Sequence, residues 1–203
     1  MLTYIFELTL STSTPRIWRK LSVPGRFTLG DLHQMLQIVF GWEERHRHEF
    51  RLGGERYTDP RALDYDDDPE LFTHDVALEK ALKGHNGFRY LYDFGDEWDV
   101  VGTILETLDI ERLSPECLDG ALAGPPEDCG GIDRYETMRD ALKNPRHPDY
   151  EEMSEWAPPG FDPDFFDKDG LTSRLTKTFK PKASSKSKKS SKAKKSSKAK
   201  KRR

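Results

Sequence analysis

Several features that define common classes of protein are missing from this 203-residue chain. It has no run of about 18 apolar residues, the length that a helix needs to cross a bilayer. Its two cysteines, Cys117 and Cys129, are too few for a four-thiolate metal site. The first ten residues lack the basic start of a secretory signal, and Glu7 interrupts their apolar run. We therefore expect a cytoplasmic protein with no membrane segment and no disulfide.

The end of the chain lacks acidic residues. From Lys177 onward there are twelve lysines, two arginines and no acid, and alanine is the only hydrophobic residue after Phe179. Such a segment cannot bury enough surface to offset the entropy cost of folding, so we expect residues 177–203 to be disordered. Residues 1–176 hold the other 19 basic residues and all 36 acidic ones, a net charge of about −17. The chain thus divides into an acidic body and a basic tail.

Hydrophobic periodicity in the body predicts an α+β domain over residues 1–170, in which a mixed or antiparallel sheet packs with a few helices. The clearest helix is expected from Leu29 to Phe40, with Thr28 as its N-cap and Gly41 as its end. Strands are expected over residues 3–10, 16–23, 48–52 and 55–57 and in two parts of 88–108 around Gly95, an acidic loop over 58–70, and further helices after Asp75 and over 134–143.

The motif "DFGDEWD" concentrates carboxylates within seven residues: Asp93, Asp96, Glu97 and Asp99. Carboxylates at this spacing can hold Mg²⁺ or Ca²⁺. The structural alternative is a tight acidic hairpin, in which Asp93 and Asp96 bind turn amides, Gly95 supplies a positive φ and Trp98 packs inward.

The motif "HRH" places His46 and His48 two residues apart, where a strand would direct both imidazoles to one face. Zinc or non-haem iron can use this spacing, and Cys129 is the candidate third ligand. Edge-strand histidines that face an acidic body explain the motif equally well, and we therefore predict no cofactor.

The stretch "GPPEDCGG" (residues 124–131) has the composition of a sharp corner before a helix. Its prolines stiffen the approach, Glu127 or Asp128 can cap the helix, and Gly130 and Gly131 allow the turn. We expect Cys129 to be a buried structural residue. The alternative is a catalytic thiol, which amide dipoles at the helix start would favour and the neighbouring acids would oppose.

Four motifs in the same order resemble the plasmid pRiA4b ORF-3-like family: residues 15–57, "YLYDFGDEWDV" (90–100), "GPPEDCGGIDRYETM" (124–138) and 144–166. The resemblance implies an α+β domain, found in bacteria and archaea and sometimes carried by mobile elements. It implies no reaction. Members often have histidine where this chain has Asp99, and cysteine where it has Gly124. If those residues bind metal in relatives, this chain has lost part of the site.

We interpret the body as a non-enzymatic interaction module with an unidentified protein partner, and the tail as a segment that binds nucleic acid without sequence specificity. This would associate the protein with the nucleoid. The alternative function is a metal-dependent hydrolase or nuclease that uses Asp93, Asp96, Glu127 and Asp128. The tail residues predicted to contact phosphates are Lys186, Lys188, Lys189, Lys192, Lys194, Lys195, Lys198, Lys200, Lys201, Arg202 and Arg203.

Overall fold

One sheet organises the protein, seen here in a computed structural model that describes residues 1–59 and 71–180. Its strands are β1 (Thr3–Leu10), β2 (Trp18–Pro24), β3 (His48–Leu52), β4 (Glu55–Thr58), β5 (Leu71–Thr73), β6 (Gly87–Tyr92), β7 (Trp98–Leu108) and β8 (Glu116–Ala121). They lie in the order β5-β4-β3-β6-β7-β1-β2-β8. Neighbouring strands are antiparallel, except that β5 is parallel to β4. The expected α+β class is confirmed.

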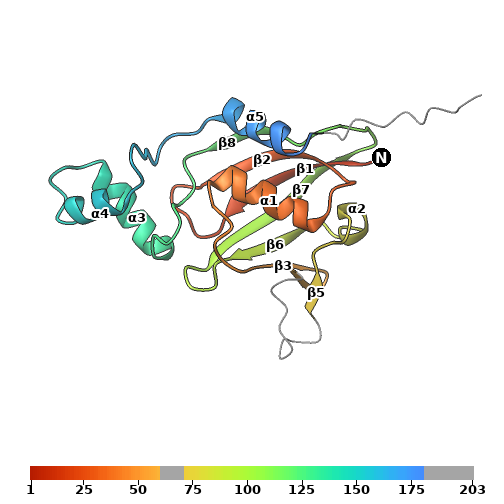
Figure 1. The fold of residues 1–203 in the computed structure, drawn as a ribbon, viewed down its shortest axis with the longest axis horizontal. Coiled ribbons are helices and arrows are strands. Elements are labelled where there is room, and N and C mark those ends of the chain that lie inside the picture. Colours follow the sequence, from red (N-terminus) through yellow and green to blue (C-terminus); the bar gives the residue numbers. More distant parts are fainter. Residues whose placement is uncertain (60–70, 181–203) are drawn as a thin grey trace, which may run out of the picture.

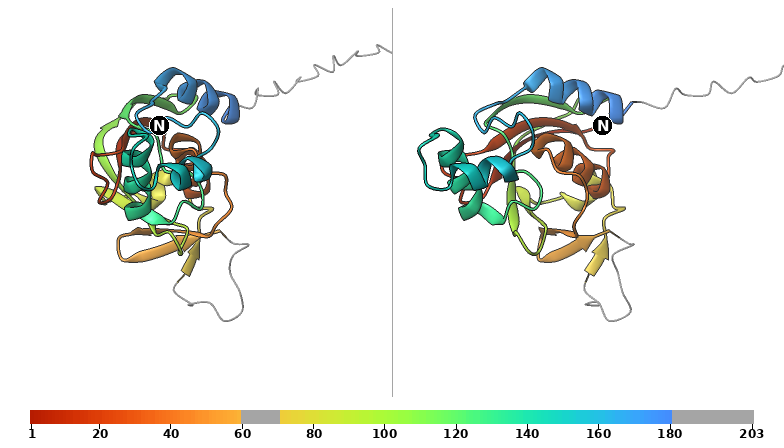
Figure 2. Two further views of the ribbon diagram at one scale, coloured as in Figure 1. Left: turned by 90° about the vertical axis from the view of Figure 1, so that its left-hand side faces the viewer. Right: turned by 60° about the vertical axis from the view of Figure 1, so that its left-hand side comes forward.

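The described helices are α1 (Leu29–Phe40), α2 (Leu78–Ala81), α3 (Gly131–Leu142), α4 (Tyr150–Trp156) and α5 (Lys168–Thr178). Helix α1 lies across one face of the sheet, and the sheet curves around it (Figures 1 and 2). Helices α3 and α4 pack together at one end of the sheet, and α5 runs along β8 (Figure 1). None of the helices in residues 1–59 and 71–180 is long and apolar enough to cross a membrane.

The ends of α1 follow from its sequence. The Thr28 hydroxyl accepts a hydrogen bond from the Asp31 amide, and the Asp31 carboxylate accepts one from the Thr28 amide. This reciprocal pair satisfies two backbone donors that the first helical turn leaves without partners. Gly41 ends the helix in the left-handed region, with φ +87°, where glycine has no steric cost. The predicted bounds of this helix are therefore confirmed.

The core lies between α1 and the sheet. Phe6, Leu8 and Leu10 of β1 are almost fully buried there, as are Leu32 and Leu36 of α1. Burial of this apolar face is the main force that holds the helix on the sheet. The strands expected over residues 3–10 and 16–23 are confirmed as β1 and β2, and the charged residue Arg19 lies on the buried face of β2 with Leu21.

Four elements have no counterpart in the sequence-based expectations: β5, β8, α4 and α5. The β8 sequence "ECLDGA" alternates weakly, and only Cys117 of this strand is fully buried. Helix α5 spans the expected domain end at residue 170, and Leu175 and Phe179 are buried. The Phe179 ring packs edge-on against Phe27 at 5.3 Å between centroids. The folded body therefore includes residues that the charge pattern assigns to the tail.

Candidate metal centre

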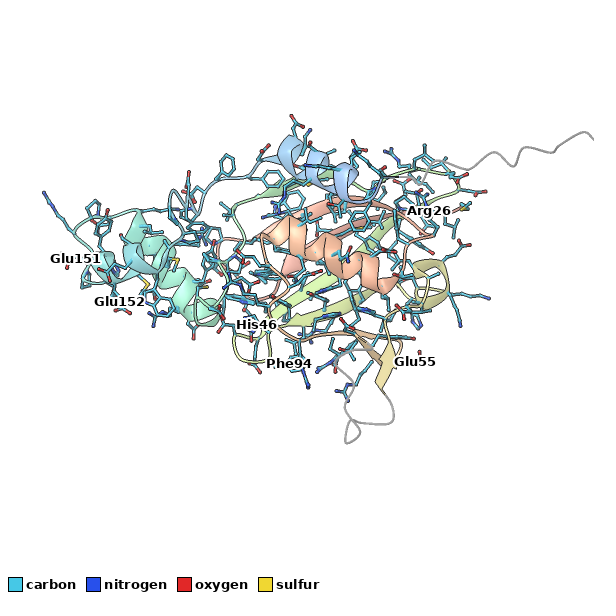
Figure 3. All side chains as sticks on the ribbon, viewed as in Figure 1. Arg26, His46, Glu55, Phe94, Glu151 and Glu152 are labelled. Carbon is cyan, nitrogen blue, oxygen red and sulfur yellow. The ribbon has the colours of Figure 1, made fainter. Side chains whose placement is uncertain are left out.

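Three loops meet at the end of the sheet that lies beside α3. They are residues 43–47 between α1 and β3, residues 93–97 between β6 and β7, and residues 124–130 before α3. The indole Nε1 of Trp42 donates to the Pro125 carbonyl at 3.1 Å, which joins the first loop to the third. The Asp93 amide donates to the Arg47 carbonyl at 3.0 Å, which joins the second loop to the first. Figure 3 marks this region by His46 and Phe94.

Side chains from all three loops converge on the imidazole of His46. Its Nε2 lies 2.9 Å from Asp128 Oδ1 and 3.5 Å from Asp93 Oδ2. One ligand atom from each of these three residues lies within 4.8 Å of the other two. Ligands bound at about 2.1 Å to a tetrahedral or octahedral cation stand roughly 3.0–3.4 Å apart. A small shift of the side chains would therefore place all three around one ion.

Glu127 approaches the same nitrogen from the third loop. Its Oε2 lies 3.7 Å from His46 Nε2, and its side chain is only 7% exposed. Its other oxygen accepts hydrogen bonds from the Tyr92 hydroxyl at 2.8 Å and from the Glu43 amide at 2.6 Å. Among the described residues, neither Glu127 Oε2 nor His46 Nε2 has a partner in hydrogen-bond geometry. Two buried polar atoms are thus directed at one place without the hydrogen bonds that burial demands.

The two aspartates of this cluster share an unusual backbone conformation. Asp93 and Asp128 both have φ +57°, a left-handed conformation that aspartate tolerates better than most residues. Asp93 Oδ1 accepts a hydrogen bond from the Gly95 amide at 2.8 Å, which leaves Oδ2 directed at His46. The expected positive φ at Gly95 is wrong, because in this turn Asp93 and Glu97 take that conformation. The expected bond from Asp93 to a turn amide and the inward packing of Trp98, which is 1% exposed, are confirmed.

Tyr92 positions Glu127, and sequence reasoning missed it. Burial, followed by the hydrogen bond to Glu127, raises the pKa of Tyr92 well above that of a free tyrosine. The hydroxyl therefore remains a donor at neutral pH and holds the carboxylate in place. The sequence signal was present, because alternation in β6 puts Tyr92 on the buried face, next to the acidic turn.

Asp96 has a structural contact. Its Oδ2 accepts a hydrogen bond from the Gly130 amide at 3.0 Å, at the start of α3. The expectation that Glu127 or Asp128 would cap this helix is therefore wrong, because the cap residue is Gly130 and no side chain of its own loop binds there. The expected glycine turn is confirmed: Gly130 and Gly131 have φ +90° and +80°.

Cys129 is buried, as the structural interpretation expected, and is 1% exposed. Burial raises the pKa of its thiol to about 12, and the negative charge of Asp96 adds to the effect. The thiol is therefore protonated at neutral pH and poorly suited to nucleophilic attack.

His48 lies apart from the cluster around His46. The strand β3 begins only at His48. The imidazole ring of His48 stacks on that of His33, with 3.6 Å between the ring centroids. Its Nε2 lies 3.1 Å from His74 Nδ1. The ligand set proposed from the sequence, His46 with His48 and Cys129, is therefore not assembled, and the acids Asp93 and Asp128 take those places around His46.

The two departures from the family pattern have local explanations. Asp99 accepts a hydrogen bond from Arg89 Nε at 3.1 Å, across the β6–β7 pair. Gly124 has no room for a side chain, because an added Cβ would overlap the carbonyl oxygen of Phe40 and lie 2.8 Å from its carbonyl carbon.

The tail residues predicted to bind nucleic acid all fall in 181–203, outside the described residues.

The fold and this cluster define a class: an α+β protein whose curved, largely antiparallel sheet carries a histidine and carboxylates on three loops at one end. Residues 3–170 match the family described as plasmid pRiA4b ORF-3-like protein, and the chain belongs to that family.

Two relatives extend this result. The chain is 33% identical over 159 residues to the uncharacterized protein y4hQ of Sinorhizobium fredii, a match that covers 74% of this chain and 78% of the relative. It also resembles the crystal structure of the protein of unknown function MM3350 from Methanosarcina mazei Go1, with a TM-score of 0.72 and 31% identity. That match covers 83% of this chain and 97% of the solved one.

Proposed function

We propose that His46, Asp93 and Asp128 bind a divalent transition metal, which activates water for a hydrolytic reaction. The observation that carries this proposal is the convergence of their ligand atoms within 4.8 Å. His46 Nε2 and the neighbouring Glu127 Oε2 are both buried there without a partner in hydrogen-bond geometry among the described residues. An ion at this point would neutralise the carboxylates and give both atoms a partner, which offsets the cost of burying them.

The ligand set favours a particular group of metals. One imidazole and two carboxylates suit Mn²⁺, Fe²⁺ or Zn²⁺, whereas Ca²⁺ and Mg²⁺ prefer oxygen ligands alone. Three protein ligands also leave coordination positions open, as catalytic sites do. Asp128 is 53% exposed, so water and a substrate can reach the cluster from its side.

Glu127 is positioned to act as the general base. A metal ion lowers the pKa of bound water toward neutrality, and a nearby carboxylate can then accept the proton. Glu127 Oε2 faces the cluster, while its Oε1 is held by Tyr92 and by the Glu43 amide. Glu127 is thus fixed by one oxygen and available through the other.

Metal binding is tested by titration of the chelator-treated protein with Mn²⁺, Zn²⁺ and Mg²⁺. The two measurements are the heat of binding by calorimetry and the midpoint temperature of thermal unfolding. We expect one metal per chain, and at 100 times its Kd the metal should add about 2.7 kcal/mol of stability. His46→Ala and Asp128→Asn should abolish the effect. His85→Ala, an exposed histidine outside the cluster, is the control and should retain it.

Protons should compete with the metal for the imidazole, so affinity should fall as the pH is lowered. If His46 served only as a counter-ion to the carboxylates, no metal would bind stoichiometrically, and the proposal would fail.

The hydrolytic step is tested separately with p-nitrophenyl phosphate, bis-p-nitrophenyl phosphate and p-nitrophenyl acetate. Glu127→Gln should keep the metal and lose about 10²- to 10⁴-fold in kcat, the usual contribution of a general base. Unchanged kcat in this variant would refute the role of Glu127. A metal-loaded protein that hydrolyses none of the three esters would refute the hydrolytic proposal and leave metal binding in place.

Binding of nucleic acid by the tail stays a prediction, supported by the run of fourteen basic residues without an acid. It is independent of the metal centre, and a partner protein for the acidic body likewise stays a prediction.

A further inference from the structure

A second site lies on the other side of the loop that carries Glu127. An open cavity of about 330 Å³ lies between the end of α1, residues 123–126 and residues 158–174. Its volume falls in the range of small-molecule sites, about 300–1,000 Å³. Its wall is largely apolar and includes aromatic and proline side chains, those of Phe40, Pro125, Pro126, Phe161, Phe165 and Phe166.

One wall of the cavity carries a buried positive charge. Arg19 is the second residue of β2 and is 2% exposed. Its guanidinium is 5.3 Å from the centre of the Phe40 ring and 5.0 Å from that of Phe166, within reach of cation–π attraction. Burial lowers the pKa of Arg19 to about 10, so the group remains charged at neutral pH.

The neighbours of Arg19 are neutral. Its Nε, Nη1 and Nη2 donate to four backbone carbonyls, those of Trp18, Val39, Ala121 and Leu122, each at 2.8 Å. A guanidinium has five N–H donors, so one on Nη2 is left without an acceptor among the described residues. No carboxylate in residues 1–59 and 71–180 forms an ion pair with it. Carbonyl dipoles and ring faces thus stabilise this charge without neutralising it.

A second arginine borders the same cavity. Arg174, on the exposed side of α5, lines it and forms no ion pair within the described part of the chain. The one acid in the lining, Asp167, is exposed and accepts a hydrogen bond from the Gly170 amide at 2.8 Å as the cap of α5. Two cations and one capping carboxylate therefore leave the cavity with a net positive charge.

We propose that this cavity binds a small amphipathic carboxylate, whose ring or alkyl chain lies against the phenylalanines and whose carboxylate pairs with Arg174 in the field of Arg19. Apolar walls supply most of the affinity through burial, and the arginines select the charged end. This site and the metal centre share only the 124–130 loop, so neither proposal depends on the other.

The test compares two probes of the same shape on the full chain by calorimetry, 4-phenylbutyrate and the neutral 4-phenyl-1-butanol. We expect the acid to bind at least about tenfold more tightly, a difference of roughly 1.4 kcal/mol. Arg174→Gln should remove most of this difference, and the charge of Arg19 accounts for what remains. Arg146→Gln, an exposed arginine outside the cavity, is the control and should leave both affinities unchanged.

A second pair of variants tests the apolar wall. Phe165 is 61% exposed, so Phe165→Ala should leave the core intact and weaken both probes. Phe94→Ala, a residue of similar exposure outside the cavity, should weaken neither. Equal affinity for acid and alcohol, or no binding of either at millimolar concentration, would overturn the proposal. Loss of binding in the Phe94 variant as well would place the site elsewhere and also overturn it.

Discussion

Replacement of Gly124 by alanine tests how tightly the loop before α3 is packed on α1. An added Cβ would overlap the Phe40 carbonyl oxygen and approach the Phe40 carbonyl carbon and Cα to 2.8 and 2.9 Å. All of these are backbone atoms, which cannot rotate away as the end of a side chain can. Either the last turn of α1 or the loop must therefore move.

The magnitude follows from what would have to move. A shift of α1 would disturb Phe40, which stacks on Trp42 at 5.1 Å, and the Arg19 bond to the Val39 carbonyl. A shift of the loop would break the bond from Trp42 Nε1 to Pro125. Overpacking costs about 1–3 kcal/mol, and one lost hydrogen bond costs roughly 1 kcal/mol more. We expect Gly124→Ala to destabilise the protein by about 2–4 kcal/mol.

Equilibrium unfolding in urea measures this loss. The matched control is Gly95→Ala, since Gly95 also has an ordinary φ and its nearest contact is a movable carboxylate oxygen of Asp93 at 3.2 Å. The control should change the free energy of unfolding by less than about 1 kcal/mol. If Gly124→Ala cost no more than Gly95→Ala, the loop would not be packed against α1 as described.

The remaining predictions concern the thiols and the tail. Burial raises the pKa of Cys117 to about 11 and that of Cys129 to about 12, so at pH 8 Cys129 should have about a thousandfold less thiolate than a free cysteine. Mass spectrometry should show slow alkylation of both by iodoacetamide until denaturant is added, and fast labelling of the native protein would contradict their burial. Removal of residues 181–203, which keeps α5, should abolish binding to duplex DNA. If about 6 to 10 charges of the full chain engage phosphates, log K should fall with log salt at a slope near −5 to −9, and equal binding by the truncated protein would show that the body contacts DNA.

The sequence by itself determined the elements whose patterns are local and strong. The alternation in β1 and β2 and the caps at Thr28 and Gly41 predicted those elements almost to the residue, because strand alternation and helix capping depend only on near neighbours. The charge pattern likewise separated an acidic body from a basic tail. It misplaced the boundary, because the burial of Leu175 and Phe179 in α5 depends on contacts with a distant part of the chain.

Only the tertiary structure decided which candidate residues meet. The sequence grouped Asp93 and Asp128 in one candidate site with Asp96 and Glu127. It placed His46 in another, with His48 and Cys129, whereas the structure brings His46 to Asp93 and Asp128. Side chains alternate between two faces only within a strand, and β3 begins after His46. The spacing of the two histidines therefore could not predict where the side chain of His46 points. The meeting of the three loops, and the cavity behind them, arise from how α1, the sheet and α3 pack, and no local pattern of residues encodes that arrangement.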